Sequence, residues 1–295
     1  MFPIVKKRQL AENIFLFDVL AKRVAAKCQP GEFVIVKQDK RGERIPLTIC
    51  DYDREAGTVT IVIQVIGGST KLITEDLNEG DEFMDFVGPL GNASDLIEED
   101  LEELKKKKIL FVAGGLGTAP VYPQVKWLHE RGIYADVVQG AKSKDFVILE
   151  DELKSVSGNL YVCTDDGSYG FKGLVTDKVK DLVVNEGKKY DHCVVIGPMI
   201  MMKFVALLTK ELGIPTIASM NTIMVDGTGM CGACRLSVGN EIKFACVDGP
   251  EFDGHEVNFD VLMSRNSFYK ATERERDHDC RMQKEAKALE TAATV

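Results

Sequence analysis

The chain has 295 residues and a formal net charge of −9, from 46 acidic and 37 basic residues. Nucleic acid phosphates require clustered Lys and Arg, so this balance disfavours a nucleic acid partner. No apolar run approaches the roughly 20 residues that cross a bilayer, and we predict no membrane span. The first ten residues lack the apolar segment of a secretory signal, so we expect a cytoplasmic protein.

Residues 1–100 are predicted to form an antiparallel β-barrel. Short alternating apolar runs, such as 33–36 and 59–65, are separated by Gly, Asp and Asn turns. A proline-stiffened strand carries Arg44-Ile45-Pro46-Leu47-Thr48, where a flat ring could lie. The turn Gly67-Gly68-Ser69-Thr70 follows a strand and fits a phosphate cradle. It fits a plain helix cap equally well, with Ser69 or Thr70 bonding the first-turn amides.

Residues 101–225 are predicted to form a doubly wound α/β domain with a parallel sheet. An apolar strand (109–113), a glycine loop, a helix (120–131) and a second strand (135–138) make a βαβ unit. Further strands at 160–163 and 193–196, with helices at 174–184 and 199–212, extend the sheet. The loop opens a helix, whose N-terminus binds pyrophosphate readily. A tight turn without a ligand is the alternative, and G-x-G-x-x-G is not present there.

The cysteines are unevenly spread. Eight are present, and a reducing compartment disfavours structural disulfides. Cys231, Cys234 and Cys246 fall within a stretch of 16 residues, which begins in a glycine-rich segment. Asp226 stands five positions before Cys231, which gives the C-x4-C-x2-C…C spacing of a two-iron cluster with Asp in first place. We therefore predict a [2Fe-2S] module over 226–270, ligated by Asp226, Cys231, Cys234 and Cys246. Structural zinc is the alternative, although it usually takes two C-x2-C pairs.

The order of these motifs carries a family resemblance. A barrel with the 46–48 and 67–70 segments, followed by an α/β domain with the 114–120 turn and Gly197-Pro198-Met199, resembles the ferredoxin-NADP reductase superfamily. The cysteine loop makes the chain similar to the dihydroorotate dehydrogenase electron-transfer subunits and to the small subunits of NADH-dependent reduced ferredoxin:NADP oxidoreductase. The latter are electron-bifurcating transhydrogenases, also labelled sulfide dehydrogenase. Asp226 and the charged tail 271–295 favour the small subunits of this oxidoreductase over the dihydroorotate dehydrogenase subunits. The tail would either dock on a partner or form a mobile end.

The resemblance implies where FAD would bind. The flavin ring would rest on Arg44, Pro46, Leu47 and Thr48, and its pyrophosphate on Gly67, Gly68, Ser69 and Thr70. Thr48 is the candidate catalytic residue, since its hydroxyl could orient the flavin N5. One departure is that the family's arginine directly precedes Pro-x-Ser/Thr, whereas Arg44 lies one residue earlier. A one-residue shift along a strand changes the face on which a side chain lies, and Arg44 departs from the family pattern in this respect.

The resemblance also implies a nicotinamide cofactor. Its pyrophosphate would lie on Gly115, Gly117, Thr118, Ala119 and Pro120. Its ribose would lie near Asp165 and Asp166, and its reactive end near Gly197, Pro198 and Met199. Two carboxylates accept ribose hydroxyls and repel a 2′-phosphate, so NAD(H) is favoured over NADP.

Together these features predict an oxidoreductase subunit. It would exchange hydride with NAD(H) and single electrons with a larger flavin and iron–sulfur subunit that binds NADPH and passes electrons to ferredoxin. The alternative within the resemblance is the electron-transfer subunit of an NAD-linked dihydroorotate dehydrogenase. A third hypothesis, from another class, is a zinc-loop protein that senses a nucleotide.

Overall fold

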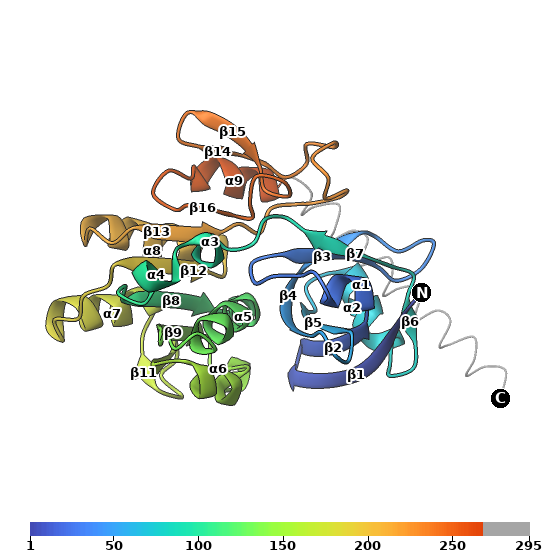
Figure 1. Ribbon diagram of the computed structural model, residues 1–295, viewed down its shortest axis with the longest axis horizontal. Helices are drawn as coiled ribbons and strands as arrows, with labels where there is room; N and C mark the ends of the chain where they lie inside the picture. Colours follow the sequence, from blue (N-terminus) through green and yellow to red (C-terminus); the bar gives the residue numbers. More distant parts are fainter. Residues whose placement is uncertain (268–295) are drawn as a thin grey trace.

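The structure is a computed structural model that describes residues 1–267 (Figure 1). The predicted tail 271–295 and Cys280 lie outside the described residues. A barrel, an α/β domain and a smaller C-terminal module lie beside one another (Figure 1). Among residues 1–267, no helix combines the length and the apolar character needed to cross a membrane.

The barrel is an antiparallel sheet of seven strands in the order β6-β1-β2-β5-β4-β3-β7. Its edge strands β6 and β7 are separated only by Met84, whose N–H donates to the carbonyl of Lys37 in β3 at 3.0 Å. The two edges therefore lie together, and the sheet is nearly closed, as predicted. Its elements are β1 (Phe2–Ala11), β2 (Ile14–Leu20), α1 (Lys22–Ala25), β3 (Phe33–Lys37), β4 (Ile45–Asp53), β5 (Thr58–Gln64), α2 (Gly68–Asp76), β6 (Glu82–Phe83) and β7 (Asp85–Leu90).

The second sheet confirms the predicted doubly wound domain. Six strands run parallel in the order β11-β10-β9-β8-β12-β13, and β16 joins the edge antiparallel. All six residues of β8 are buried, as expected for a parallel strand with helices on both faces. Helices α5 and α6 pack on one face, and α7 and α8 on the other.

The elements of this region include two short 3-10 turns, at Gly115–Gly117 and Lys144–Phe146, and a π-helical turn at Asp181–Asn185. The others are α3 (Asp95–Glu98), α4 (Leu101–Leu104), β8 (Ile109–Gly114), α5 (Thr118–His129), β9 (Asp136–Ala141), α6 (Glu150–Val156), β10 (Asn159–Thr164), β11 (Phe171–Lys172), α7 (Val175–Lys180), β12 (His192–Ile196), α8 (Met199–Glu211) and β13 (Thr216–Ser219).

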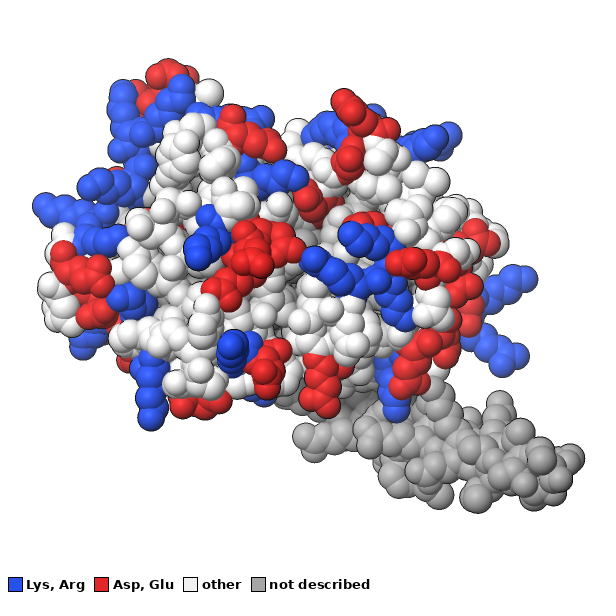
Figure 2. All heavy atoms as spheres, turned by 90° about the horizontal axis from the view of Figure 1, so that it is seen from below, with Lys and Arg blue, Asp and Glu red and all other residues white. Residues whose placement is uncertain are grey.

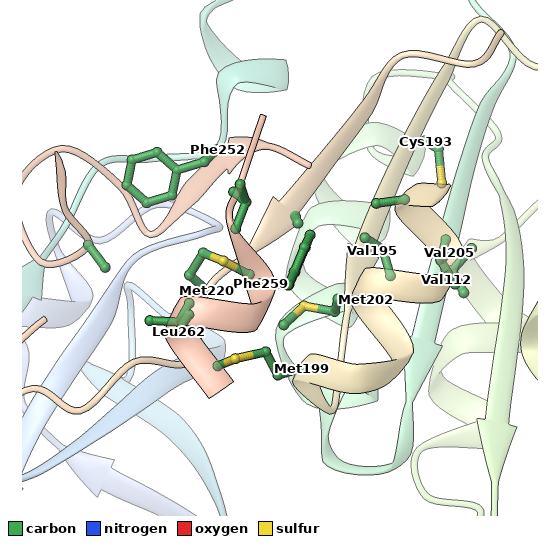
Figure 3. Close-up of a cluster of buried hydrophobic side chains, with 14 of the residues drawn as sticks. Val112, Cys193, Val195, Met199, Met202, Val205, Met220, Phe252, Phe259 and Leu262 are labelled. Atoms are coloured by element: carbon green, nitrogen blue, oxygen red, sulfur yellow. The ribbon is translucent and has the colours of Figure 1, made fainter. Parts of the chain in front are cut away.

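The C-terminal module shares a core with the α/β domain. It consists of the hairpin β14 (Arg235–Val238) and β15 (Glu241–Phe244), then β16 (Glu251–Asp253) and α9 (Phe259–Asn266). Met199 and Met202 of α8 lie in one cluster with Phe259 and Leu262 of α9 (Figure 3). Because β16 also pairs with β13, the module is fixed to the sheet rather than tethered to it.

A partly buried carboxylate supports this junction and makes stability depend on pH. The Gln124 side-chain N–H donates to Glu251 Oε1 at 2.6 Å, and burial raises the pKa of Glu251 from 4.5 to about 7. The folded chain therefore holds a proton that the unfolded chain releases. The bound proton stabilises the folded chain; this contribution to the free energy of unfolding is complete below about pH 4.5 and is lost as the pH rises through about 7.

We expect Glu251→Gln to remove this dependence. Because the amide oxygen still accepts from Gln124, the variant should be more stable than the parent at pH 8, by up to about 3 kcal/mol, and similar to it at pH 5. Urea unfolding at both pH values measures the difference. An equal offset at the two pH values would contradict the assignment.

Candidate functional site

Strand β4 presents the predicted flavin segment on the outside of the barrel. Leu47 and Ile49 are buried in the barrel core, so Pro46 and Thr48 lie on the opposite face. In β3 their partners are Ile35 and Phe33, which are buried in the core shared by the α/β domain and the C-terminal module. The structure thus turns Pro46 and Thr48 toward those two parts, whereas Leu47 could offer a ligand only its backbone.

The 67–70 turn caps α2 through Thr70. Its Oγ1 accepts from the N–H groups of Ile66 and Gly67 at 3.0 and 3.1 Å. A Cβ on Gly67 or on Gly68 would meet no atom of the described residues within 4 Å. Thr70 therefore caps the helix, but it bonds amides that precede the first turn rather than the first-turn amides of the hypothesis, and packing does not explain the two glycines. They leave room in front of a helix N-terminus, where an anion is stabilised.

The predicted nucleotide loops meet at one edge of the sheet, because β8, β10 and β12 are parallel. The strand order reverses between β8 and β12, the place where α/β sheets bind ligands. A Cβ on Gly117 would lie 2.1 Å from the carbonyl oxygen of Ile196, so this glycine lets the two loops touch. Gly115 differs. Its φ is +53° and its Cβ position is open, so it faces free space beside the loop.

Side chains around these loops are divided between surface and core. Asp165 and Asp166 are exposed after β10, and Ser168 donates to Asp166 from its N–H and its hydroxyl at 2.9 and 2.7 Å, which lowers the pKa of Asp166. Pro198 is exposed, whereas the side chain of Met199 is buried in the cluster of Figure 3. Thr118, Ala119 and Pro120 are also buried, so this part of the loop could offer a ligand mainly backbone.

The four predicted metal ligands fall into two pairs. Cys234 Sγ and Cys246 Sγ are buried and 3.2 Å apart. The other pair is more exposed, and in it the N–H of Cys231 donates to Asp226 Oδ2 at 2.9 Å. Within residues 1–267, no three His, Cys, Asp or Glu side chains converge as they would on a single ion. Two separate pairs suit a group containing two metal atoms better than one tetrahedral zinc.

The electrostatics of the buried pair keep its thiols protonated in the absence of a cation. Burial and the neighbouring Cys234 raise the pKa of the Cys246 thiol to about 12. Two adjacent thiolates are therefore unfavourable in this place unless a positive ion lies between them. A metal supplies that charge, since thiols that bind metals are deprotonated.

The metal-ligand loop is held against the flavin segment. Arg44 donates through Nε to the carbonyl of Val225 at 2.8 Å and through Nη2 to that of Asp226 at 3.3 Å. A Cβ on Gly227 would lie 2.7 Å from Ile35 Cδ1 of β3, so the loop is in close contact with the barrel. Sequence reasoning placed Arg44 beside the flavin and did not foresee this contact. Its one-residue displacement along the strand was the available signal.

A cleft of about 810 Å³ is separate from these loops. It lies between the barrel and the C-terminal half of α5. Four charged groups in its lining form ion pairs, Lys126 with Asp51 at 2.8 Å and Arg131 with Glu130 at 3.7 Å. Acidic and basic side chains are also interspersed over the face seen in Figure 2. We therefore do not include this cleft in the candidate site.

Comparison with known proteins agrees with this geometry. Residues 221–258 match the model of the iron-sulfur cluster binding domain of dihydroorotate dehydrogenase B. A Thermotoga maritima homologue of the dihydroorotate dehydrogenase B (NAD(+)) electron transfer subunit is 45% identical over 92% of both chains. The "Uncharacterized protein in adh 3'region" of Clostridium beijerinckii is 63% identical, also over 92% of both. A chain of the NADH-dependent reduced ferredoxin-NADP oxidoreductase structure, described for flavin-based electron bifurcation, is 42% identical with a TM-score of 0.85, covering 96% of this chain and 98% of that one.

Fold and site define an oxidoreductase subunit with the architecture of the ferredoxin reductases. More particularly, the chain belongs to the family of dihydroorotate dehydrogenase B electron-transfer subunits and their homologues.

Proposed function

We propose that the chain is the electron-transfer subunit of a cytoplasmic, electron-bifurcating NADH-dependent ferredoxin:NADP oxidoreductase. It exchanges hydride with NAD(H) and single electrons with a larger partner subunit. In this proposal residues 1–100 hold FAD, 101–225 hold NAD(H) and 226–270 hold a [2Fe-2S] cluster. The observation that carries it is the contact between the loop of paired metal ligands and the barrel, through Arg44, directly before the strand that carries Pro46 and Thr48, and through Ile35 of β3.

The barrel residues fit a flavin. Pro46 and Thr48 form a surface for the ring, with the Thr48 hydroxyl available to orient N5, while the N-terminus of α2 at Gly67, Gly68, Ser69 and Thr70 takes the pyrophosphate. Bound flavin accepts a hydride and releases electrons singly, so the chain need supply only position and polarity. Arg44, which faces the metal-ligand loop, and Leu47, which faces the barrel core, support the strand from its two sides.

The sheet edge fits NAD(H). Gly115, Gly117, Thr118, Ala119 and Pro120 form the pyrophosphate turn, and Gly197, Pro198 and Met199 lie at the nicotinamide end. Asp165 and Asp166 accept hydrogen bonds from ribose hydroxyls. Because a low pKa keeps Asp166 charged, it also repels the 2′-phosphate that distinguishes NADP.

Asp226, Cys231, Cys234 and Cys246 would hold the [2Fe-2S] cluster. Support comes from their arrangement in two pairs and from the family model that matches this segment. An oxygen donor in place of one thiolate gives the iron less electron density, so we expect a higher reduction potential than in an all-cysteine site.

The partner we propose is a larger flavin and iron–sulfur subunit that binds NADPH and passes electrons to ferredoxin. Support comes from the 42% identity to a chain of the NADH-dependent reduced ferredoxin-NADP oxidoreductase. The second candidate is the electron-transfer subunit for dihydroorotate oxidation, because residues 221–258 match the cluster domain of dihydroorotate dehydrogenase B. Identification of the large subunit that co-purifies with the chain distinguishes the two.

Purification of the native chain tests the whole proposal. We expect a brown-yellow protein that contains FAD, iron and acid-labile sulfide and reduces a dye with NADH. A strong preference for NADPH would overturn the role given to Asp165 and Asp166. A colourless protein with zinc and without flavin would instead support the nucleotide sensor.

We expect Gly68→Ala to have opposite effects on flavin content and on stability. A Cβ at Gly68 meets no described atom within 4 Å, and alanine favours a helix more than glycine by up to about 1 kcal/mol. The apoprotein should therefore be as stable as the parent or slightly more so. The added methyl group lies where the phosphate would approach, so bound FAD should fall at least tenfold at a fixed FAD concentration. Flavin absorbance after dialysis and urea unfolding of the apoprotein measure the two effects.

A further inference from the structure

Glu43 and Arg44, which directly precede β4, reach two different parts of the site. Glu43 Oε2 accepts from the Ser69 hydroxyl at 2.6 Å, next to the turn that we assign to the flavin pyrophosphate. Arg44 instead bonds the carbonyls of Val225 and Asp226 at 2.8 and 3.3 Å. The two side chains thus reach different partners from adjacent positions that precede β4. This dipeptide therefore connects the phosphate turn with the metal-ligand loop.

Arginine is well suited to the second contact. Its planar guanidinium holds several N–H donors in a fixed geometry, so it can bond two successive carbonyls at once. A lysine ammonium is a single point of charge and would hold them less rigidly. The acceptors lie 181 and 182 residues away in the sequence, and one belongs to Asp226, itself a proposed ligand. Arg44 thereby fixes the backbone from which that ligand projects.

The charge of Arg44 has no carboxylate partner among residues 1–267, where the ion pairs involve other cations. It is partly buried, at hydrogen-bond distance from the metal-ligand loop. Reduction adds a negative charge to a cluster, and a nearby positive charge stabilises that form. A partly buried pair is screened less than an exposed one.

From these contacts we propose that Arg44 is a positioning residue for the cluster rather than a flavin ligand. It fixes the metal-ligand loop against the flavin strand, and its charge raises the cluster's reduction potential. The inference rests on the proposed function, because it requires that FAD and the cluster are both bound. Beyond that function, the inference is that one side chain of the flavin segment, Arg44, controls how readily electrons pass between FAD and the cluster.

The test compares Arg44→Gln, Arg44→Lys and Arg41→Gln in the full chain purified with its cofactors. Arg41 is exposed, three residues away, and its replacement removes the same charge. In Arg44→Gln we expect parental FAD content, an altered electron-resonance spectrum and a tenfold slower reduction of the cluster by NADH in stopped flow. The one-electron reduction potential of the cluster in this variant should fall by about 59 mV, which corresponds to a tenfold change in the equilibrium constant for its reduction. Arg44→Lys should keep most of the potential but lose rate, and Arg41→Gln should match the parent.

Two results would overturn the inference. Loss of FAD from Arg44→Gln with an unchanged cluster spectrum and potential would make Arg44 a flavin ligand. Parental values of rate, spectrum and potential would leave it no role in electron transfer. If Arg44→Gln does not fold, the Arg44→Lys spectrum and rate decide, since a shift in both supports the inference and parental values oppose it. Absence of iron and FAD from the parent itself would instead refute the proposed function.

Discussion

Replacement of Asp226 by alanine is expected to remove or scramble the iron–sulfur cluster, whereas Asp226→Cys should keep iron and change the spectrum. The carboxylate supplies the oxygen donor that we propose, and it also organises the loop. It accepts from the N–H groups of Thr228 and Cys231 at 2.7 and 2.9 Å, and from the Thr228 hydroxyl. Alanine provides neither function, while cysteine restores a fourth donor. Iron and sulfide content and the electron-resonance spectrum measure the effect.

A matched control is available in the same module. The carboxylate of Asp248 accepts from the N–H of Phe244 at 2.6 Å, so Asp248→Ala also removes a carboxylate bonded to backbone. It should cost about 1 kcal/mol of stability and leave the iron content unchanged. In the Asp226→Cys variant we expect a lower potential, because sulfur gives iron more electron density than oxygen does. Unchanged iron and spectra in both Asp226 variants would move the fourth ligand elsewhere, and Cys280, outside the described residues, would be the next candidate.

Local pattern was sufficient to predict the barrel and four parallel strands of the second sheet, but not the short strands β11 and β13. The apolar run 109–113 lies between polar segments, and such a run indicates a strand buried on both faces, as β8 is. Strand β16 was not predicted. It has only three residues, Glu251–Asp253, and it exists because it pairs with β13 more than 30 positions earlier. Short strands are determined by such distant partners rather than by their own composition.

Prediction of the site was limited in the same way. Motif spacing brought the candidate ligands together in sequence, and the structure places Cys234 beside Cys246. Arg44 was expected at the flavin, but its partners are backbone carbonyls of Val225 and Asp226, and backbone acceptors leave no pattern in a sequence. Met199 was expected at the nicotinamide end as part of its loop. Its side chain is buried against the C-terminal module, which only the packing of α8 on α9 could reveal (Figure 3).

Gly115→Ala is expected to lower the affinity for NADH at least tenfold while the fold is retained. The Cβ position of Gly115 is open, so the added methyl group meets no described atom within 4 Å. The backbone cost is that of a φ of +53°, about 1 kcal/mol for a residue other than glycine. A pyrophosphate that approaches the turn closely would collide with the methyl group. Titration of NADH by flavin fluorescence, together with urea unfolding, separates the two effects.

Gly132 distinguishes ligand binding from backbone strain. Its φ is +76° and its Cβ position is also open, but it follows the C-terminal end of α5, whereas Gly115 precedes the N-terminal end. Gly132→Ala should therefore lose a similar amount of stability and keep the parental affinity for NADH. Because the two substitutions match in strain and in free space, any excess loss of affinity in Gly115→Ala must come from the ligand. Equal affinities in the two variants would mean that the pyrophosphate binds away from this turn.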